Sequence, residues 1–233
     1  MALGLPRLCP FFIVSRLNMF QSFLSIFLSF AIWLPVCLGQ ISAPDAEDVK
    51  NMAIEQVLAD FEAKKYKEAL EKLHTLQKTY PDDPLIFNLI GSVQIKKKDY
   101  AAAWTSFREA LKNQPGFFPA EYNLGEILFL EKKYAEAREH FQAMRASDTR
   151  HELLQFKVFL CDLQSGEKDR ARRVMNAIKY PGDSPAWYYA KAAWEYKQGN
   201  LKKAREYVLG AKYIFGDKTA LFDETFETLN FKL

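Results

Sequence analysis

The sequence predicts an all-α protein, in which antiparallel helix pairs stack into an array that ends in a C-terminal capping helix. An alanine recurs with a constant step, at Ala69, Ala103, Ala137 and Ala171. Large apolar residues keep the same step, four places after each alanine. A fixed period of about 34 residues is typical of helix-turn-helix units, which bury their apolar faces only by stacking on one another. The repeated step therefore predicts the architecture.

The constant step divides residues 50–217 into an array of about five units. Set on the alanines, the frame gives the units 50–83, 84–117, 118–151, 152–185 and 185–218. The fifth unit is shifted back by one position, because Ala204 comes one place earlier than the step from Ala171 predicts. Asp83 before Pro84 predicts a helix that starts with an N-cap and a proline in its first turn. Asp99 predicts a tight turn between the paired helices of the second unit.

Small and large residues are expected to match between the two helices of a unit. Gly91 and Gly125 place a small residue where the second helix must pass close to the first. Phe107 and Phe141 lie one turn after the recurring alanines, on the same helix face. In the fourth unit, Phe159 stands at the glycine position. The residues expected to set the packing are Ala69, Gly91, Ala103, Phe107, Gly125, Ala137, Phe141, Ala171 and Ala204.

These segments resemble tetratricopeptide repeats. The second unit carries the family's packing pattern in Phe87, Ile90, Gly91, Tyr100, Ala103, Phe107, Ala110 and Pro115. The third carries it in Leu124, Gly125, Tyr134, Ala137, Phe141 and Met144. The resemblance covers about residues 50–216 and is partial in the other units. It implies a right-handed superhelical α-solenoid that binds proteins.

In the family resemblance, the first helix of each pair lines a concave groove, which is the expected binding site. Apolar and aromatic side chains dominate these positions here, and exposed patches of this kind mark interaction sites. The expected apolar anchors are Tyr122, Phe129, Phe156, Tyr189 and Tyr196, with Asn88, Asn123 and Glu126 orienting polar groups. The alternative is that these residues belong to the core, and core is favoured for Phe156.

A clamp for a chain-terminal carboxylate is not expected in this groove. Some family members form such a clamp with Lys, Asn and Arg at set positions. Asn88 and Ser92 stand where Lys and Asn would be needed, and Asn123 fits one place alone. The expected ligand is therefore another peptide, helix or loop of a protein partner.

The segment 218–233 is predicted to form a capping helix and tail. Apolar residues gather on one side of it and acidic residues toward the other. The apolar side carries Leu221, Phe222, Phe226 and Leu229, and the acidic side carries Asp223, Glu224 and Glu227. Such a helix is expected to cover the last repeat and to present its charges to water.

Residues 1–39 have the composition of a secretory signal peptide. Arg7 and Arg16 precede an apolar run from Phe23 to Leu34, and small residues at Cys37 and Gly39 predict cleavage before Gln40. Two alternatives are an uncleaved membrane anchor over residues 20–39 and lipidation of the cysteine. All three export the array to the periplasm or another extracytoplasmic space. Residues 40–49 are expected to form a linker.

Composition and motifs argue against catalysis and against nucleic-acid binding. Without the leader, 30 basic and 29 acidic residues remain, so a phosphate backbone is not attracted. The basic run Lys96–Lys98 is interpreted as a solvated helix end or turn. The histidines at 74, 140 and 151 have no metal-ligand spacing around them, and no phosphate-binding or nucleophile motif is present. We therefore expect no metal, no cofactor and no small-molecule substrate.

The sequence as a whole predicts a non-enzymatic protein-protein interaction scaffold exported to the cell envelope. A peptide, helix or loop of the partner would bind in the concave groove. The alternative is a membrane-anchored structural subunit of an envelope assembly. In that case residues 20–39 remain in the membrane, and the convex face or the tail makes the contacts.

Overall fold

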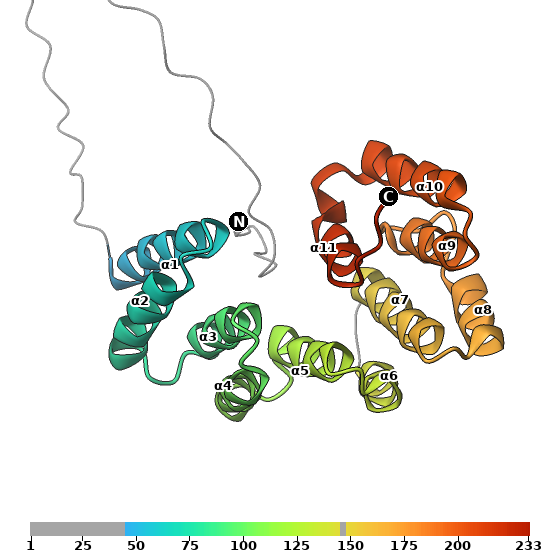
Figure 1. The fold of residues 1–233 in the computed structure, drawn as a ribbon. Coiled ribbons are helices and arrows are strands. Elements are labelled where there is room, and N and C mark those ends of the chain that lie inside the picture. The colour runs from blue at the N-terminus through green and yellow to red at the C-terminus, as the bar shows by residue number, and fades with distance from the viewer. Residues whose placement is uncertain (1–44, 145–147) are drawn as a thin grey trace, which may run out of the picture.

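The computed structural model describes residues 45–144 and 148–233, and within these ranges the chain is helical with short turns (Figure 1). The predicted signal peptide and the first half of the predicted linker, residues 40–44, lie outside the described residues. The α-helices are α1 (Ala46–Glu62), α2 (Tyr66–Thr79), α3 (Pro84–Lys96), α4 (Tyr100–Asn113), α5 (Phe118–Leu130), α6 (Tyr134–Ala143), α7 (Asp148–Gln164), α8 (Lys168–Ala177), α9 (Ala186–Lys197), α10 (Leu201–Phe215) and α11 (Ala220–Thr228). A short 3-10 helix, Gly216–Thr219, joins α10 to α11.

Consecutive helices pair and the pairs follow one another around an arc, which confirms the predicted all-α solenoid. The odd-numbered helices from α1 to α9 face the inner side of the arc, and the even-numbered helices from α2 to α10 form its outer side (Figure 1). The second helices begin at Tyr66, Tyr100, Tyr134, Lys168 and Leu201, so the last step is shorter by one position than the others. No helix within the described ranges is long and apolar enough to cross a membrane.

Glycines bring the two helices of the second and third units into close contact. A Cβ built on Gly91 would lie 2.5 Å from Cε1 of Phe107, and one on Gly125 would lie 2.5 Å from Cε1 of Phe141. All nine residues expected to set the packing are buried. The fourth unit packs differently. Its aromatic side chain lies on the first helix, where Phe159 occupies the glycine position, and Met175 on the second helix occupies the phenylalanine position.

The turns between paired helices repeat one backbone conformation. Lys64, Lys98 and Lys132 follow one another at the repeat step and have positive φ angles of 59°, 62° and 63°. Gly166 and Gly199 take the same place in the fourth and fifth units, each with φ of 83°. A lysine incurs a steric penalty in this left-handed region that glycine does not.

Replacing Lys64 with glycine is therefore expected to stabilise the protein by about 0.5–1 kcal/mol, since strain is relieved at an exposed turn. Chemical denaturation followed by circular dichroism measures the change. Glu71→Gly, at an exposed position in the middle of α2, is the control and is expected to cost about 1 kcal/mol. A destabilised Lys64→Gly variant would contradict the strain argument.

Side-chain caps mark the starts of α1 and α3, and the start of α1 differs from the expected linker boundary. The side chain of Asp83 accepts a hydrogen bond from the backbone N–H of Leu85 at 2.8 Å, so α3 starts as predicted. The first helix begins at Ala46, inside the segment predicted as a linker. Asp45 and Asp48 form a reciprocal capping box there, which fixes the helix start ahead of the predicted boundary at residue 50.

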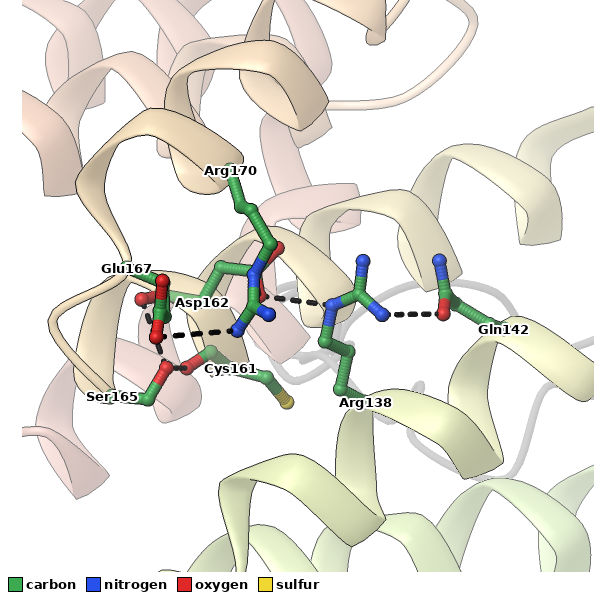
Figure 2. A network of polar contacts seen from close by, with 7 residues as sticks. All are labelled: Arg138, Gln142, Cys161, Asp162, Ser165, Glu167 and Arg170. Carbon is green, nitrogen blue, oxygen red and sulfur yellow. Dashed lines mark hydrogen bonds and ion pairs between the residues drawn. The ribbon is translucent and has the colours of Figure 1, made fainter.

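A buried carboxylate joins α6, α7 and α8 at the junction of the third and fourth units (Figure 2). Asp162 is fully buried, and its Oδ1 accepts hydrogen bonds from Nε of Arg138 at 2.9 Å and from Nε of Arg170 at 3.1 Å. Arg138 also donates to Gln142 at 2.7 Å. One side chain therefore connects three helices across the junction.

The C-terminal helix α11 turns back onto the inner side of the arc, beside α7 and α9 (Figure 1). Phe222 is 4% exposed and its ring centroid lies 5.0 Å from that of Phe156 and 5.1 Å from that of Tyr189. Two of the acidic residues expected to face water make internal contacts instead. Asp223 accepts a hydrogen bond from the Tyr189 hydroxyl at 2.6 Å, and Glu224 is ion-paired with Lys96.

Candidate partner-binding groove

The concave face holds a pocket of about 650 Å³ between α3, α5, α7 and α11. Its apolar wall is formed by Ile95, Phe129, Leu130, Leu221 and Leu229. Side chains three or four residues apart share one helix face, so successive turns of α3 and α5 point into the same space. A pocket of this size accommodates several side chains of a ligand.

Four of the eight residues predicted for the groove line this pocket. These are Tyr122, Asn123, Glu126 and Phe129, all on α5. Asn123 also reaches α3, because its Nδ2 donates a hydrogen bond to Oδ1 of Asn88 at 3.0 Å. Both amides are buried, so the fifth predicted residue supports the pocket from behind.

The other three predicted residues lie on the same inner face but beneath the C-terminal segment. Phe156 and Tyr189 are fully buried under α11, and the ring of Phe226 lies 5.0 Å from that of Tyr189. Tyr196 stacks on Phe231 with ring centroids 4.4 Å apart. The sequence allowed these three residues to belong either to the core or to the groove. In the structure the chain's own C-terminal segment covers them.

Lys157 is the central cation of the site and is fully buried. Its Nζ donates to Oε2 of Glu126 at 2.8 Å and to Oγ1 of Thr225 at 3.0 Å. The same atom lies 5.7 Å from the ring centroid of Tyr122 and 5.6 Å from that of Phe129. Ion pairing, hydrogen bonding and aromatic faces together compensate a buried ammonium. The lysine thus fixes α5, α7 and α11 around the pocket.

Sequence reasoning missed both lysines that tie α11 to the array. The interpretation of Lys96 as part of a solvated helix end is wrong, because it pairs with Glu224 across the groove. Lys157 stands inside the apolar run from Leu153 to Leu163, where a charged residue interrupts a buried helix face. A charge within such a run, here at Lys157 and again at Asp162, is the signal that could have found it, because buried charges require partners.

Several polar atoms at the pocket lack a hydrogen-bond partner among the described residues. They are the hydroxyl of Tyr122, Oε1 of Glu126 and Nε2 of Gln164, all buried. Burial, together with the negative charges of Glu126 and Glu224, raises the pKa of Tyr122 well above its ordinary value. The phenol therefore stays protonated and remains a hydrogen-bond donor at neutral pH.

The groups gathered here are suited to recognition. Within the described residues, no group of three or more His, Cys, Asp or Glu side chains is placed to hold a metal ion. His140 makes a hydrogen bond with the backbone carbonyl of Glu121 at 2.7 Å, so its ring joins two helices of the third unit. The pocket combines apolar surface with convergent donors and a carboxylate, which is the chemistry of a binding site.

Cys161 is expected to resist alkylation in the folded protein. Burial raises the pKa of its thiol to about 12, so only about one molecule in ten thousand carries the thiolate at pH 8. Iodoacetamide labelling, followed by mass spectrometry of the peptide that contains Cys161, should be slow until denaturant is added. The unfolded chain loses this proton at a lower pH than the folded protein does. The free energy of unfolding therefore falls as the pH rises above the ordinary thiol pKa. Rapid labelling of folded protein would contradict this.

The sequence model of the tetratricopeptide repeat family matches residues 54–117 and 99–151 of the chain. No curated protein sequence matches it significantly. The family match includes the second and third units, in which the sequence pattern is most regular.

Solved structures share the fold at low sequence identity. A tetratricopeptide repeat protein from Parabacteroides merdae is 15% identical with a TM-score of 0.62, and 77% of this chain and 70% of that one are covered. A thermophilic repeat protein from Thermus thermophilus is 16% identical with a TM-score of 0.57, covering 78% and 99%. Pseudomonas aeruginosa PilF is 15% identical with a TM-score of 0.55, covering 78% and 92%. The family match and the shared solenoid identify this chain as a tetratricopeptide repeat protein.

Proposed function

We propose that the chain is a non-enzymatic scaffold, exported to the cell envelope, that binds a peptide, helix or loop of a partner protein on its concave face. The observation that carries this proposal is the pocket beside α11, which combines an apolar wall with polar atoms that have no hydrogen-bond partner in the part of the chain that the structure describes. Proteins of this repeat family are generally interaction scaffolds, and an open pocket on the inner face supports such a role here.

The chain's own tail supports the inner face as a surface that accepts helices. Phe222 and Phe226, one helical turn apart on α11, are nearly fully buried against α7 and α9. The C-terminal half of the groove is therefore occupied within the molecule. The half over α3 and α5 stays open beside it, which makes it the part available to a partner.

A photocrosslinking amino acid at position 132, on the rim of the pocket, tests the binding site in cells. We expect it to capture a protein that the same amino acid at position 173, exposed on the outer helix α8, does not capture. Ser92→Trp, which fills the pocket from α3, should abolish that capture while circular dichroism shows an unchanged helical melt. Equal capture from both positions, or capture unaffected by the filled pocket, would contradict the proposal.

Export rests on the leader, whose residues lie outside the described part of the chain. N-terminal sequencing of the protein purified from cell fractions tests it. A start at Gln40 in a soluble envelope fraction supports the cleaved form. An intact leader in the membrane fraction supports the alternative, a membrane-anchored structural subunit.

One structural observation favours that alternative function. The outer helix α10 exposes a row of large apolar side chains, with Leu209, Tyr213 and Ile214 exposed by 59%, 92% and 55%. Exposed apolar clusters of this kind mark protein contacts. If the photocrosslinking amino acid captures a partner from position 213 and not from position 132, the convex face is the surface that contacts the partner.

A further inference from the structure

We infer that the open pocket beside α11 binds an acidic amphipathic helix of a partner protein. This inference rests on the proposed function, because it specifies the chemistry of the segment that the groove accepts. Three features of the described residues point to it: the balance of charge at the pocket, the unpartnered hydrogen-bond donors, and the character of α11 itself.

The pocket carries more positive than negative charge. Four lysines line it, and the two glutamates among its lining residues are already paired, Glu126 with Lys157 and Glu224 with Lys96. Lys98 and Lys132 have no ion-pair partner within the described part of the chain. A ligand that brings carboxylates would neutralise these two lysines, and charge complementarity of this kind favours one class of partner over others.

The two free lysines are held at equivalent places. Each follows an inner helix after a single intervening residue, Lys98 after α3 and Lys132 after α5, at φ of 62° and 63°. The two positions are one repeat apart and line the same pocket. A single bound segment that crosses the pocket can therefore carry acidic side chains toward both lysines.

The unpartnered groups of the pocket are mostly donors. Within residues 45–144 and 148–233, the hydroxyl of Tyr122, which is 5% exposed, and Nε2 of Gln164 each lack an acceptor, whereas Oε1 of Glu126 lacks a donor. A carboxylate ligand satisfies donors that are otherwise left buried without a bond. A ligand rich in acceptors therefore fits these groups better than a basic one.

The chain's own C-terminal helix shows which chemistry this face accepts. On α11, Asp223 and Glu224 bond to Tyr189 and Lys96, while Phe222 packs against aromatic rings of α7 and α9. The same combination of apolar wall and lysines continues over α3 and α5, in the pocket beside α11. A second helix of similar character would lie next to α11.

Two synthetic peptides with the purified full chain test the inference. One copies residues 218–231, and the other has lysine at the three acidic positions of that segment. We expect fluorescence anisotropy to show that the acidic peptide binds, more weakly as salt is raised, and that the charge-reversed peptide does not. Equal binding of the two peptides, or no binding of either, would overturn the inference.

Matched variants locate the contact. Lys98→Gln with Lys132→Gln should weaken binding of the acidic peptide by about five- to tenfold, as expected for two rim charges. The control combines Lys64→Gln, at the equivalent turn of the first unit, with Lys202→Gln on α10, because neither residue lines the pocket. Equal weakening by the two double variants would overturn the assignment to this pocket.

Hydrogen exchange distinguishes binding beside α11 from replacement of α11. The inference requires that the amides of residues 220–228 keep their protection when the peptide is bound. Loss of that protection would overturn it, since the peptide would then occupy the place of the tail. If crosslinking from position 132 still captures a partner while the acidic peptide fails to bind, the proposed function stands and only the acidic character of the ligand is rejected.

Discussion

Replacing Gly91 with alanine is expected to destabilise the protein by about 2 kcal/mol, although alanine favours helix formation. The added methyl group would lie 2.5 Å from Cε1 and 2.7 Å from Cζ of Phe107, a ring that is completely buried. The ring cannot move without displacing its own neighbours, because protein interiors are close-packed. Urea denaturation followed by circular dichroism measures the loss.

Gly210→Ala is the matched control for this substitution. Gly210 also lies within a helix, α10. A Cβ added there would lie 3.4 Å from its nearest neighbour, Cε1 of Tyr188, which is an ordinary contact. The control should gain about 0.5–1 kcal/mol from helix propensity. A Gly91→Ala variant as stable as Gly210→Ala would show that close packing does not explain the recurring glycine.

A second substitution tests the match between small and large residues directly. Phe107→Leu makes room for the new methyl group, as in the first unit, where Val57 and Leu73 hold the equivalent positions. We expect the double variant Gly91→Ala/Phe107→Leu to be more stable than the sum of the two single losses predicts, by about 1 kcal/mol or more. Strict additivity would contradict a direct contact.

The array is predictable from the sequence because each unit repeats its own local rules. The alanine step locates the helix pairs, and its shortening before Ala204 agrees with the start of α10 at Leu201, one place earlier than the regular step from Lys168 predicts. Asp83 caps α3 as expected, and Asp99 lies in the expected turn, where it caps α4. Such features depend on neighbours a few positions away or one repeat away, which periodicity reveals.

The position of the tail could not be predicted in the same way. The apolar face of α11 is visible in the sequence, but the surface that it covers is not. Phe222 meets Phe156 of α7, and Glu224 meets Lys96 at the distant end of α3. Contacts of this range follow no repeat, so periodicity offers no reason to choose the groove over the end of the array.

Buried charges on α7 were missed for a related reason. Glu152, Lys157 and Asp162 are each at most 4% exposed, in a helix whose apolar pattern predicts only core. Each has partners on other elements; Glu152, for example, accepts hydrogen bonds from the backbone N–H groups of Asp183 and Ser184. Their partners lie outside the repeat pattern, and only the folded chain brings them together.

Removing both arginines around Asp162 is expected to destabilise the protein by about 3–5 kcal/mol, because it leaves a buried carboxylate without a counter-charge. Arg138 comes from α6 and Arg170 from α8, and both donate to the same oxygen (Figure 2). Either arginine alone still compensates the charge. Arg138→Ala and Arg170→Ala should therefore cost only about 1–2 kcal/mol singly, and the double variant should lose more than their sum.

Two further variants separate loss of charge compensation from loss of arginine packing. Arg173→Ala, on the same helix α8 but exposed and without an ion pair to any described residue, should change stability by less than about 0.5 kcal/mol. Asp162→Asn, placed in the double-arginine variant, removes the stranded charge and should restore about 2 kcal/mol. Urea unfolding supplies these values. If asparagine restores nothing, the arginines stabilise the junction of α6, α7 and α8 through their contacts alone, and the buried carboxylate is not what makes them necessary.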